Sequence, residues 1–390
     1  MRWSRVSARS ITDVIEVLIP AGEVAIWTPV TPASPAGVAL PFGTSILLWE
    51  PHCRFVRQSS RVLAIPPVDL LEASRDPESR ARQIELLDTA CSRTGYALLT
   101  GHRIPTSLLT ELYSVSRQFF LLSDDEKAAV RQPAPEQVRG WTGLGSEGMA
   151  YSLDEESHGD LKEKMDIGPV SGPTVGQPGA SPMAYPNLWP RFPERFRAVW
   201  EDYYRHMQRV GAELLSLAAE GFGLPPDHFA PMFDTEMSML RGLYFPPQPE
   251  PPLAHQARAG IHTDYGAFTV VSAESSPGGL QVLDPDGEWL EVTTTPATLV
   301  VLTGDLLAEW TGDHWPATLH RTANPPRSVA FDSSRLSFAF YQHPNFDVSV
   351  AALPPFAASD PTAVPDPLRA GDHLAEKYVR QTTFGRRTAD

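Results

Sequence analysis

Cysteine is scarce in this chain of 390 residues, since only Cys53 and Cys91 carry a thiol. Two cysteines cannot form a disulfide framework, and their spacing excludes a CxxC-type metal site, so both fit a reducing cytoplasm. Lysine is nearly as scarce, at only four of the 32 basic residues. Together with 39 prolines, this bias toward arginine is typical of a protein encoded by GC-rich bacterial DNA.

Excess positive charge and long apolar runs are also missing. The net charge of −15 argues against a nucleic acid or an anionic membrane as partner, because phosphate binding needs a basic surface. The best apolar run, Gly37–Trp49, is shorter than the roughly 18–20 residues that span a membrane and contains Pro41. Met1-Arg2 is basic, but no apolar segment with a small-residue cleavage site follows closely, so we do not expect a secretory signal. We therefore expect a cytoplasmic protein, a monomer or weak homo-oligomer, with a small-molecule substrate.

The composition that remains is that of a globular protein, with 42% hydrophobic and 20% charged residues. Residues 1–60 are an extension that is either an irregular, strand-bearing segment or an over-extended reading frame, and both readings stay open. Residues 61–235 form a helical region with loops, and residues 236–350 are rich in short β runs. Residues 351–390 are a tail that ends in a helix.

Apolar residues at helical spacing predict the main helices of the first region, Ser79–Ala90, Ser107–Leu121 and Phe196–Phe222. A strand is expected at 95–99. The segment 130–195 is rich in Gly, Pro and Ser and predicts a long, mostly irregular stretch with strand pieces at Met149–Leu153 and Lys164–Ile167. Long loops inside enzymes often cover a substrate.

Short β runs separated by turns follow residue 236. One turn, Asp284-Pro285-Asp286-Gly287, has the residues that preset a hairpin, since proline fixes one dihedral angle and glycine supplies a positive one. This spacing predicts a mostly β fold with flanking helices, built on a jelly-roll core with the helices packed on its outside. The expected strands are 237–245, 268–272, 280–283, 299–302 and 337–341.

Three possible metal ligands occur in this β-rich region. His262 and Asp264 flank one residue, and side chains two apart on a strand point to the same side. His320 follows on a distant predicted strand. Two imidazoles and one carboxylate form a facial triad for iron(II) that leaves the opposite side of the metal open, whereas a catalytic zinc site is the chemical competitor. Each part alone is weak, and their order and strand spacing carry the prediction.

Arg335 and Ser337 share one face of a later predicted strand. Arginine grips a carboxylate through two parallel hydrogen bonds, and the serine hydroxyl adds a donor. The apolar run that follows, 338–341, indicates that the strand is buried. This pair therefore predicts a site for a carboxylate near the metal.

From Ile65 onward the chain resembles the isopenicillin N synthase-like family of iron(II)/2-oxoglutarate-dependent dioxygenases. The resemblance rests on several marks in order: Ile65-Pro66-Pro67-Val68-Asp69-Leu70, Gly101-His102-Arg103-Ile104-Pro105, Asp160-Leu161-Lys162-Glu163, Ile261-His262-Thr263-Asp264-Tyr265-Gly266, Gly304-Asp305, Leu319-His320-Arg321 and Arg335-Leu336-Ser337. It implies a double-stranded β-helix, a jelly roll, with helices around it. It makes 61–235 an amino-terminal dioxygenase region and 236–350 the catalytic core.

The resemblance implies that His262, Asp264 and His320 bind iron(II), and that Arg335 and Ser337 bind the far carboxylate of 2-oxoglutarate, with O2 as the oxidant. Many members place Asn-x-Tyr-Pro before the iron motif, where this chain has Leu243-Tyr244-Phe245-Pro246. Arg241 could supply a replacement charge. Tyr265, Phe340 and the Met149–Leu153 segment are candidate pocket walls, although core packing is the simpler interpretation of each.

Three functions remain open. The first is a 2-oxoglutarate-dependent enzyme that hydroxylates, desaturates or cyclises a small molecule in bacterial secondary metabolism, such as antibiotic biosynthesis, or in amino-acid metabolism. The second is an oxidase of the isopenicillin N synthase or ethylene-forming kind, which uses the same iron site. The third, more remote, is a jelly-roll binding protein without catalysis.

Overall fold

The computed structural model describes residues 3–9, 14–20, 66–150, 158–292, 294–295, 297–357 and 366–383. The chain falls into two compact units, Met1–Ala64 and Ile65–Asp390. In the first unit β1 (Trp3–Arg9) and β2 (Val14–Pro20) pair as an antiparallel hairpin. The remainder of that unit, including the apolar run at 37–49, lies outside the described residues.

The helices of the second unit lie close to their predicted positions. The longest are α2 (Pro77–Thr94), α3 (Thr106–Phe120) and α5 (Phe196–Gly221). Helix α2 starts where the Asp76 carboxylate accepts the backbone N–H of Ser79, and it ends at Gly95, whose φ of 71° suits glycine. The shorter helices are α1 (Leu70–Ala73), α4 (Asp124–Ala128), α6 (Asp305–Trp310) and α7 (Ala370–Thr383).

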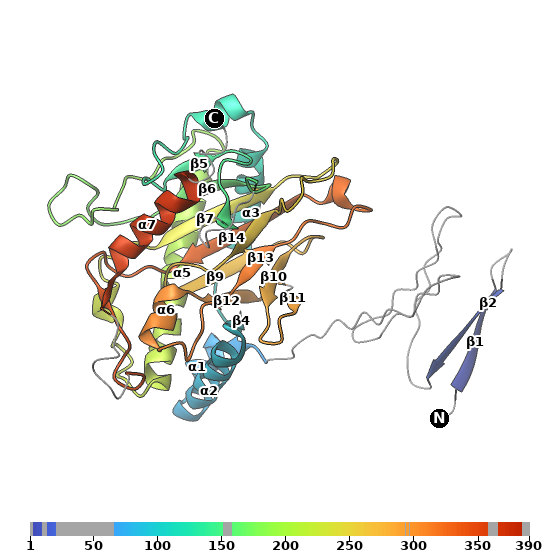
Figure 1. Ribbon diagram of the computed structural model, residues 1–390, viewed down its shortest axis with the longest axis horizontal. Coiled ribbons are helices and arrows are strands. Elements are labelled where there is room, and N and C mark those ends of the chain that lie inside the picture. The colour runs from blue at the N-terminus through green and yellow to red at the C-terminus, as the bar shows by residue number, and fades with distance from the viewer. Residues whose placement is uncertain are drawn as a thin grey trace. The chain divides into compact units, whose positions relative to one another are not determined.

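Two sheets form the core of this unit (Figure 1). The larger has the order β3-β4-β12-β9-β14-β7-β6-β5, and the smaller has the order β11-β10-β13-β8. Their bounds are β3 (Val68–Asp69), β4 (Tyr96–Thr100), β5 (Gly140–Thr142), β6 (Glu163–Ile167), β7 (Met239–Phe245), β8 (Ala259–His262), β9 (Phe268–Ala273), β10 (Leu280–Leu283), β11 (Trp289–Glu291), β12 (Leu299–Thr303), β13 (His320–Thr322) and β14 (Arg335–Tyr341), with a small pair β15 (Ser349–Val350) and β16 (Leu368–Arg369).

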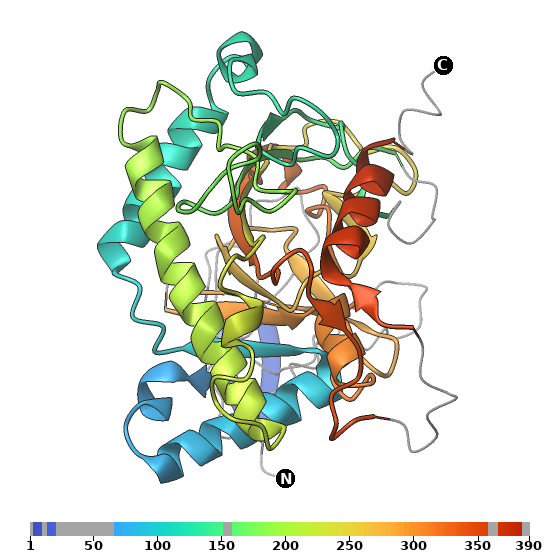
Figure 2. The ribbon, with the colours of Figure 1, turned by 90° about the vertical axis from the view of Figure 1, so that its left-hand side faces the viewer.

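Strand β14 shows how the core is divided. Its residues Leu336, Phe338 and Phe340 are fully buried on the outer face, where the Phe338 ring meets Tyr113 of α3 and Trp200 of α5 edge-on at 5.0 and 5.8 Å. The residues between them point into the space between the two sheets. Figure 2 shows α5 along one side of the strands and α7 along the other. The predicted jelly-roll core with outer helices is confirmed.

Two local predictions need comment. The turn at Asp284 forms between β10 and β11 as expected, with Gly287 at φ 82° and its N–H on the Asp284 carbonyl. The strand expected at Met149–Leu153 is wrong for Met149 and Ala150, because the Met149 N–H is taken by the Asp160 side chain and not by a strand neighbour. Residues 151–157 lie outside the described part. Within the described ranges no helix is long and apolar enough to cross a membrane.

Candidate active site

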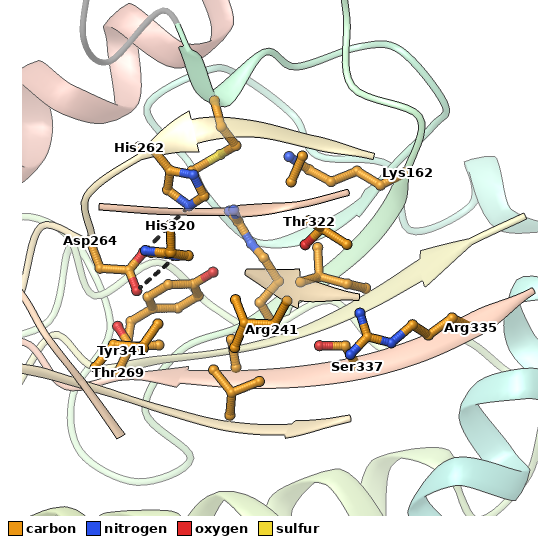
Figure 3. Close-up of a pocket in the computed structure, with 17 residues that line it drawn as sticks. Lys162, Arg241, His262, Asp264, Thr269, His320, Thr322, Arg335, Ser337 and Tyr341 are labelled. Atoms are coloured by element: carbon orange, nitrogen blue, oxygen red, sulfur yellow. Dashed lines mark ion pairs between the residues drawn. The ribbon is translucent and has the colours of Figure 1, made fainter. Parts of the chain in front are cut away.

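A cavity lies between the two sheets, and strands of both supply its walls (Figure 3). The small sheet contributes residues of β8, β10 and β13, and the large sheet contributes residues of β7, β9, β12 and β14. Apolar side chains make up much of the lining. The charged and imidazole groups that line it are Lys162, Arg241, His262, Asp264, His320 and Arg335.

His262, Asp264 and His320 meet at one end of the cavity. Their candidate ligand atoms all lie within 4.8 Å of one another, and all three side chains are buried. The Nε2 atoms of both histidines lie 3.7 Å from the Asp264 carboxylate, one facing each oxygen (Figure 3). The residues that the sequence offered as metal ligands are therefore adjacent in space.

The strand register produces this meeting. His262 is the last residue of β8 and His320 the first of β13, and the two stand opposite each other in the antiparallel pair. Asp264 lies in the loop after β8, where its backbone carbonyl accepts the N–H of Asp305 at 2.8 Å. Helix α6, which the sequence did not predict, begins at this contact and so fixes the Asp264 loop.

The hydrogen bonds of the imidazoles leave the right atoms free for a metal. Nδ1 of His262 donates to the Gly260 carbonyl at 2.8 Å, and Nδ1 of His320 donates to the Thr318 carbonyl at 2.9 Å. Each ring is therefore held with Nε2 as the unprotonated ligand. Oδ2 of Asp264 is buried without a hydrogen-bond partner among the described residues. Two nitrogens and a carboxylate oxygen in this arrangement fit iron(II).

Burial sets the protonation of the same groups. Burial and the neighbouring His320 ring hold the pKa of His262 well below its usual range. Burial raises the pKa of the Asp264 carboxyl, and His320 opposes that rise. A neutral His262 is the form that binds a metal, and a bound cation would restore the ionised carboxylate.

Arg335 and Ser337 lie on the inner face of β14 and line the same cavity (Figure 3). Arg335 is 4% exposed, and its Nε donates to the Glu274 backbone carbonyl at 3.0 Å. No residue in the described ranges accepts from its two Nη atoms. A buried guanidinium with open donors is a receptor for a carboxylate, because an unpaired buried charge is costly.

Arg241 also lines the cavity, from β7, but its guanidinium is already engaged. It forms two parallel hydrogen bonds with Asp166, from Nε at 2.7 Å and from Nη2 at 3.0 Å. Nη1 lies 3.7 Å from Glu147. Leu243 lines the cavity beside it, at the place where many family members have the asparagine.

The two aromatic wall candidates lie elsewhere. Phe340 is on the outer face of β14, where its ring meets Tyr204 of α5 at 5.2 Å, and it does not line the cavity. Tyr265 packs against Tyr378 of α7 in a separate apolar cluster. Besides the two histidines, Tyr341 is the aromatic residue among the described ones that lines the cavity, and Met149 of the candidate 149–153 segment lines it too.

A group of buried charges beside the cavity carried no predicted role. This charged cluster has three acids and three bases, each at most 6% exposed: Glu147, Asp160, Lys162, Lys164, Asp166 and Arg241. Burial alone would raise the pKa of Glu147, but Lys164, Arg241 and Lys162 together hold it below its usual range. The charged residues at every second position, 160, 162, 164 and 166, were the available signal, since residues two apart on a strand share a face.

Two family descriptions match the chain. The non-haem dioxygenase in morphine synthesis N-terminal family matches residues 65–191, and the 2OG-Fe(II) oxygenase superfamily matches residues 236–344. The second range contains His262, Asp264, His320, Arg335 and Ser337.

Among similar proteins, a proline hydroxylase of Petromyces alliaceus is 32% identical over 69% of this chain and 84% of its own length. A homoarginine-6-hydroxylase of Oryza sativa subsp. japonica is 28% identical over 74% of this chain and 88% of its own length. A full-length Neurospora crassa protein solved in complex with alpha-KG, which is 2-oxoglutarate, superposes with a TM-score of 0.71. It is 26% identical, over 83% of this chain and 98% of that one.

The similarity to these proteins agrees with the geometry of the site, in which three residues fit iron(II) and the Arg335 guanidinium is open toward the cavity. The chain is an iron(II)- and 2-oxoglutarate-dependent dioxygenase that acts on small molecules, and it belongs to the 2OG-Fe(II) oxygenase superfamily, in its isopenicillin N synthase-like family.

Proposed function

We propose that His262, Asp264 and His320 hold the iron(II) and that Arg335 and Ser337 bind the far carboxylate of 2-oxoglutarate. The observation that carries this proposal is the pair of open groups on one cavity. The Asp264 Oδ2 has no hydrogen-bond partner among the described residues, and the Arg335 Nη atoms have no acceptor there. The Asp264 end of the cavity is therefore suited to a cation, and the Arg335 end is suited to an anion.

The iron and the 2-oxo acid together supply the oxidising chemistry, in which O2 is reduced, 2-oxoglutarate is converted to succinate and carbon dioxide, and a substrate C–H bond is oxidised. The residues of this chain hold and orient the reactants in the cavity. The Gly260 and Thr318 carbonyls orient the two imidazoles, and Arg335 fixes the distance of the cosubstrate from the metal end. A contribution of Arg241 to cosubstrate binding stays a prediction.

The reaction that we favour is hydroxylation of a small molecule, with desaturation or ring closure as variants on the same site. Relatives named as a proline hydroxylase and a homoarginine-6-hydroxylase support hydroxylation and point to amino-acid or secondary metabolism. The arginine-rich composition supports a bacterial source. We also propose a monomer or weak homo-oligomer in the cytoplasm.

The test is succinate formation from 2-oxoglutarate in air, with iron(II) and a panel of small molecules. We expect slow turnover without substrate and faster turnover with a substrate, and both should be lost in His262→Ala. Absence of turnover with every 2-oxo acid would contradict the cosubstrate assignment and favour an oxidase that grips its own substrate's carboxylate through Arg335.

A further inference from the structure

Two buried lysines of the charged cluster differ in one respect. Nζ of Lys164 lies 2.9 Å from Glu147 Oε1 and 3.0 Å from Asp166 Oδ2, and Lys164 does not line the cavity. Lys162 does line it, and Figure 3 shows its side chain reaching toward the His262 end. The two residues are equally buried, so they form a natural pair for comparison.

The ammonium of Lys162 has a donor to spare. Its Nζ donates to Asp160 Oδ2 at 2.5 Å and lies 3.6 Å from Glu147 Oε2. An ammonium carries three N–H bonds, of which Asp160 accepts one, and the 3.6 Å to Glu147 is too long for a hydrogen bond. In the described ranges no second acceptor lies within hydrogen-bond distance, and Lys162 lines the cavity on the side that the two acids leave open. A buried donor of this kind calls for an acceptor on the ligand.

Charge balance restricts what that acceptor can be. The charged cluster contains three carboxylates and three cations, so it is neutral as a whole. At the other end, iron(II), Asp264, a 2-oxoglutarate dianion and Arg335 also sum to zero. A substrate carboxylate at Lys162 would be a third anion around an ammonium that two acids already surround. Burying that uncompensated charge is unfavourable.

We propose that Lys162 is a substrate-binding residue that donates a hydrogen bond to an uncharged oxygen of the substrate, a carbonyl or a hydroxyl. This rests on the proposed function. Any charged group of the substrate then lies away from Lys162. The cavity lining also includes the apolar residues Met149, Leu243 and Ala259, so apolar parts of the substrate can pack in the same cavity as the oxygen that Lys162 binds.

The test compares Lys162→Met with Lys164→Met, both loaded with zinc(II) and 2-oxoglutarate without O2. The probes are matched pairs, thymine with uracil-5-carboxylate and nicotinamide with nicotinate, and their binding is measured by saturation-transfer NMR. We expect an uncharged probe to bind the wild-type protein more tightly than its carboxylate partner. Its affinity should fall about tenfold or more in Lys162→Met and stay within about twofold in Lys164→Met, since a hydrogen bond from a charged donor is lost only in the first.

Three results would overturn the proposal: a preference for the carboxylates, an equal loss in both variants, or no binding of any uncharged probe. Zinc and 2-oxoglutarate binding, measured in the same samples, report on the proposed function separately. If those two ligands bind and the variants do not differ, only the role of Lys162 fails.

Either single variant could misfold, because each leaves a buried carboxylate with less compensation. Two neutral double variants therefore accompany them, Lys162→Met with Asp160→Asn and Lys164→Met with Glu147→Gln. Each removes one acid and one base and leaves the charged cluster balanced. The same difference in probe affinity is expected between them, and an equal affinity would count against Lys162.

Discussion

Two groups of charged residues at the cavity treat their charges differently. The first group, the triad and Arg335, keeps an open atom toward the cavity at Asp264 Oδ2 and at the Nη atoms of Arg335. The second group is the charged cluster, whose charges pair with one another, as Arg241 does with Asp166. The first group has the chemistry of a receptor and the second that of a scaffold. Lys162 is the member of the second group that retains a donor for the cavity.

The difference separates two meanings of a buried charge. A buried group without a protein partner is costly unless a ligand supplies one, so its place marks a binding site. A buried ion pair that is fully hydrogen-bonded holds the surrounding structure in place, and removal of one partner lowers the free energy of unfolding. Substitutions in the two groups should therefore change different measurements.

The largest effect is expected at the metal end. His262→Ala removes one of three ligands, so iron(II) affinity and 2-oxoglutarate turnover should each fall by more than about a hundredfold. Loss of a residue that only hydrogen-bonds to a metal ligand costs up to about a hundredfold, and loss of the ligand itself should cost more. Metal content after dialysis measures the first and succinate formation the second. His314→Ala, at a histidine on the surface, is the control. Unchanged iron content in His262→Ala would contradict the ligand assignment.

The next effect concerns the charged cluster. Arg241→Met leaves Asp166 buried without its bidentate partner and should lower the free energy of unfolding by about 3–5 kcal/mol. The double variant Arg241→Met with Asp166→Asn should recover most of that loss, because both charges leave together. Urea unfolding of both measures this. Equal loss in the two variants would show that the ion pair is not the source of the stability.

A smaller effect is expected at the cosubstrate end. Arg335→Met should weaken 2-oxoglutarate binding by about 30-fold, equivalent to ~2 kcal/mol, because a desolvated carboxylate loses its charged partner. Iron affinity should not change. Calorimetric titration of the metal-loaded protein measures the affinity, and Arg369→Met, at a half-exposed arginine, serves as control. A 2-oxoglutarate affinity equal to that of the wild type would remove Arg335 from the site.

The smallest effect is expected at His343, a buried histidine that belongs to neither group. Burial, with His373 and two arginines nearby, lowers the pKa of His343 to about 3. Above pH 6.5 the ring is neutral in both the folded and the unfolded state. Below that pH the imidazole is protonated in the unfolded chain but stays neutral in the folded protein. The free energy of unfolding should therefore fall by ~1.4 kcal/mol per pH unit. His343→Gln should show a shallower loss between pH 6.5 and 5 in urea unfolding.

Much of this arrangement could be predicted from the sequence. Periodicity located α2, α3 and α5 to within a few residues, and period-two spacing placed Arg335 and Ser337 on one face. The same rule, carried further along β14, assigns Tyr341 to the cavity and Phe340 to the core. The choice of Phe340 as a pocket wall therefore ignored this rule, since side chains alternate between the two faces along the whole strand.

Other features depended on contacts between distant segments. Lys162 pairs locally with Asp160, but Glu147 near Lys162 and Asp166 on Arg241 are distant in the sequence, so no local pattern shows which charges are paired and which stay open. Helix α6 is only six residues long, and it begins where Asp305 donates to the Asp264 carbonyl. Tyr265 follows the metal motif directly, yet it turns toward α7.

The most direct test is a crystal structure grown without O2 in the presence of manganese(II) and 2-oxoglutarate. We predict the metal on the Nε2 atoms of His262 and His320 and on the Asp264 carboxylate, with the far carboxylate of 2-oxoglutarate on Arg335 and Ser337. A metal held by other residues, or a 2-oxoglutarate carboxylate bound away from Arg335, would contradict the account.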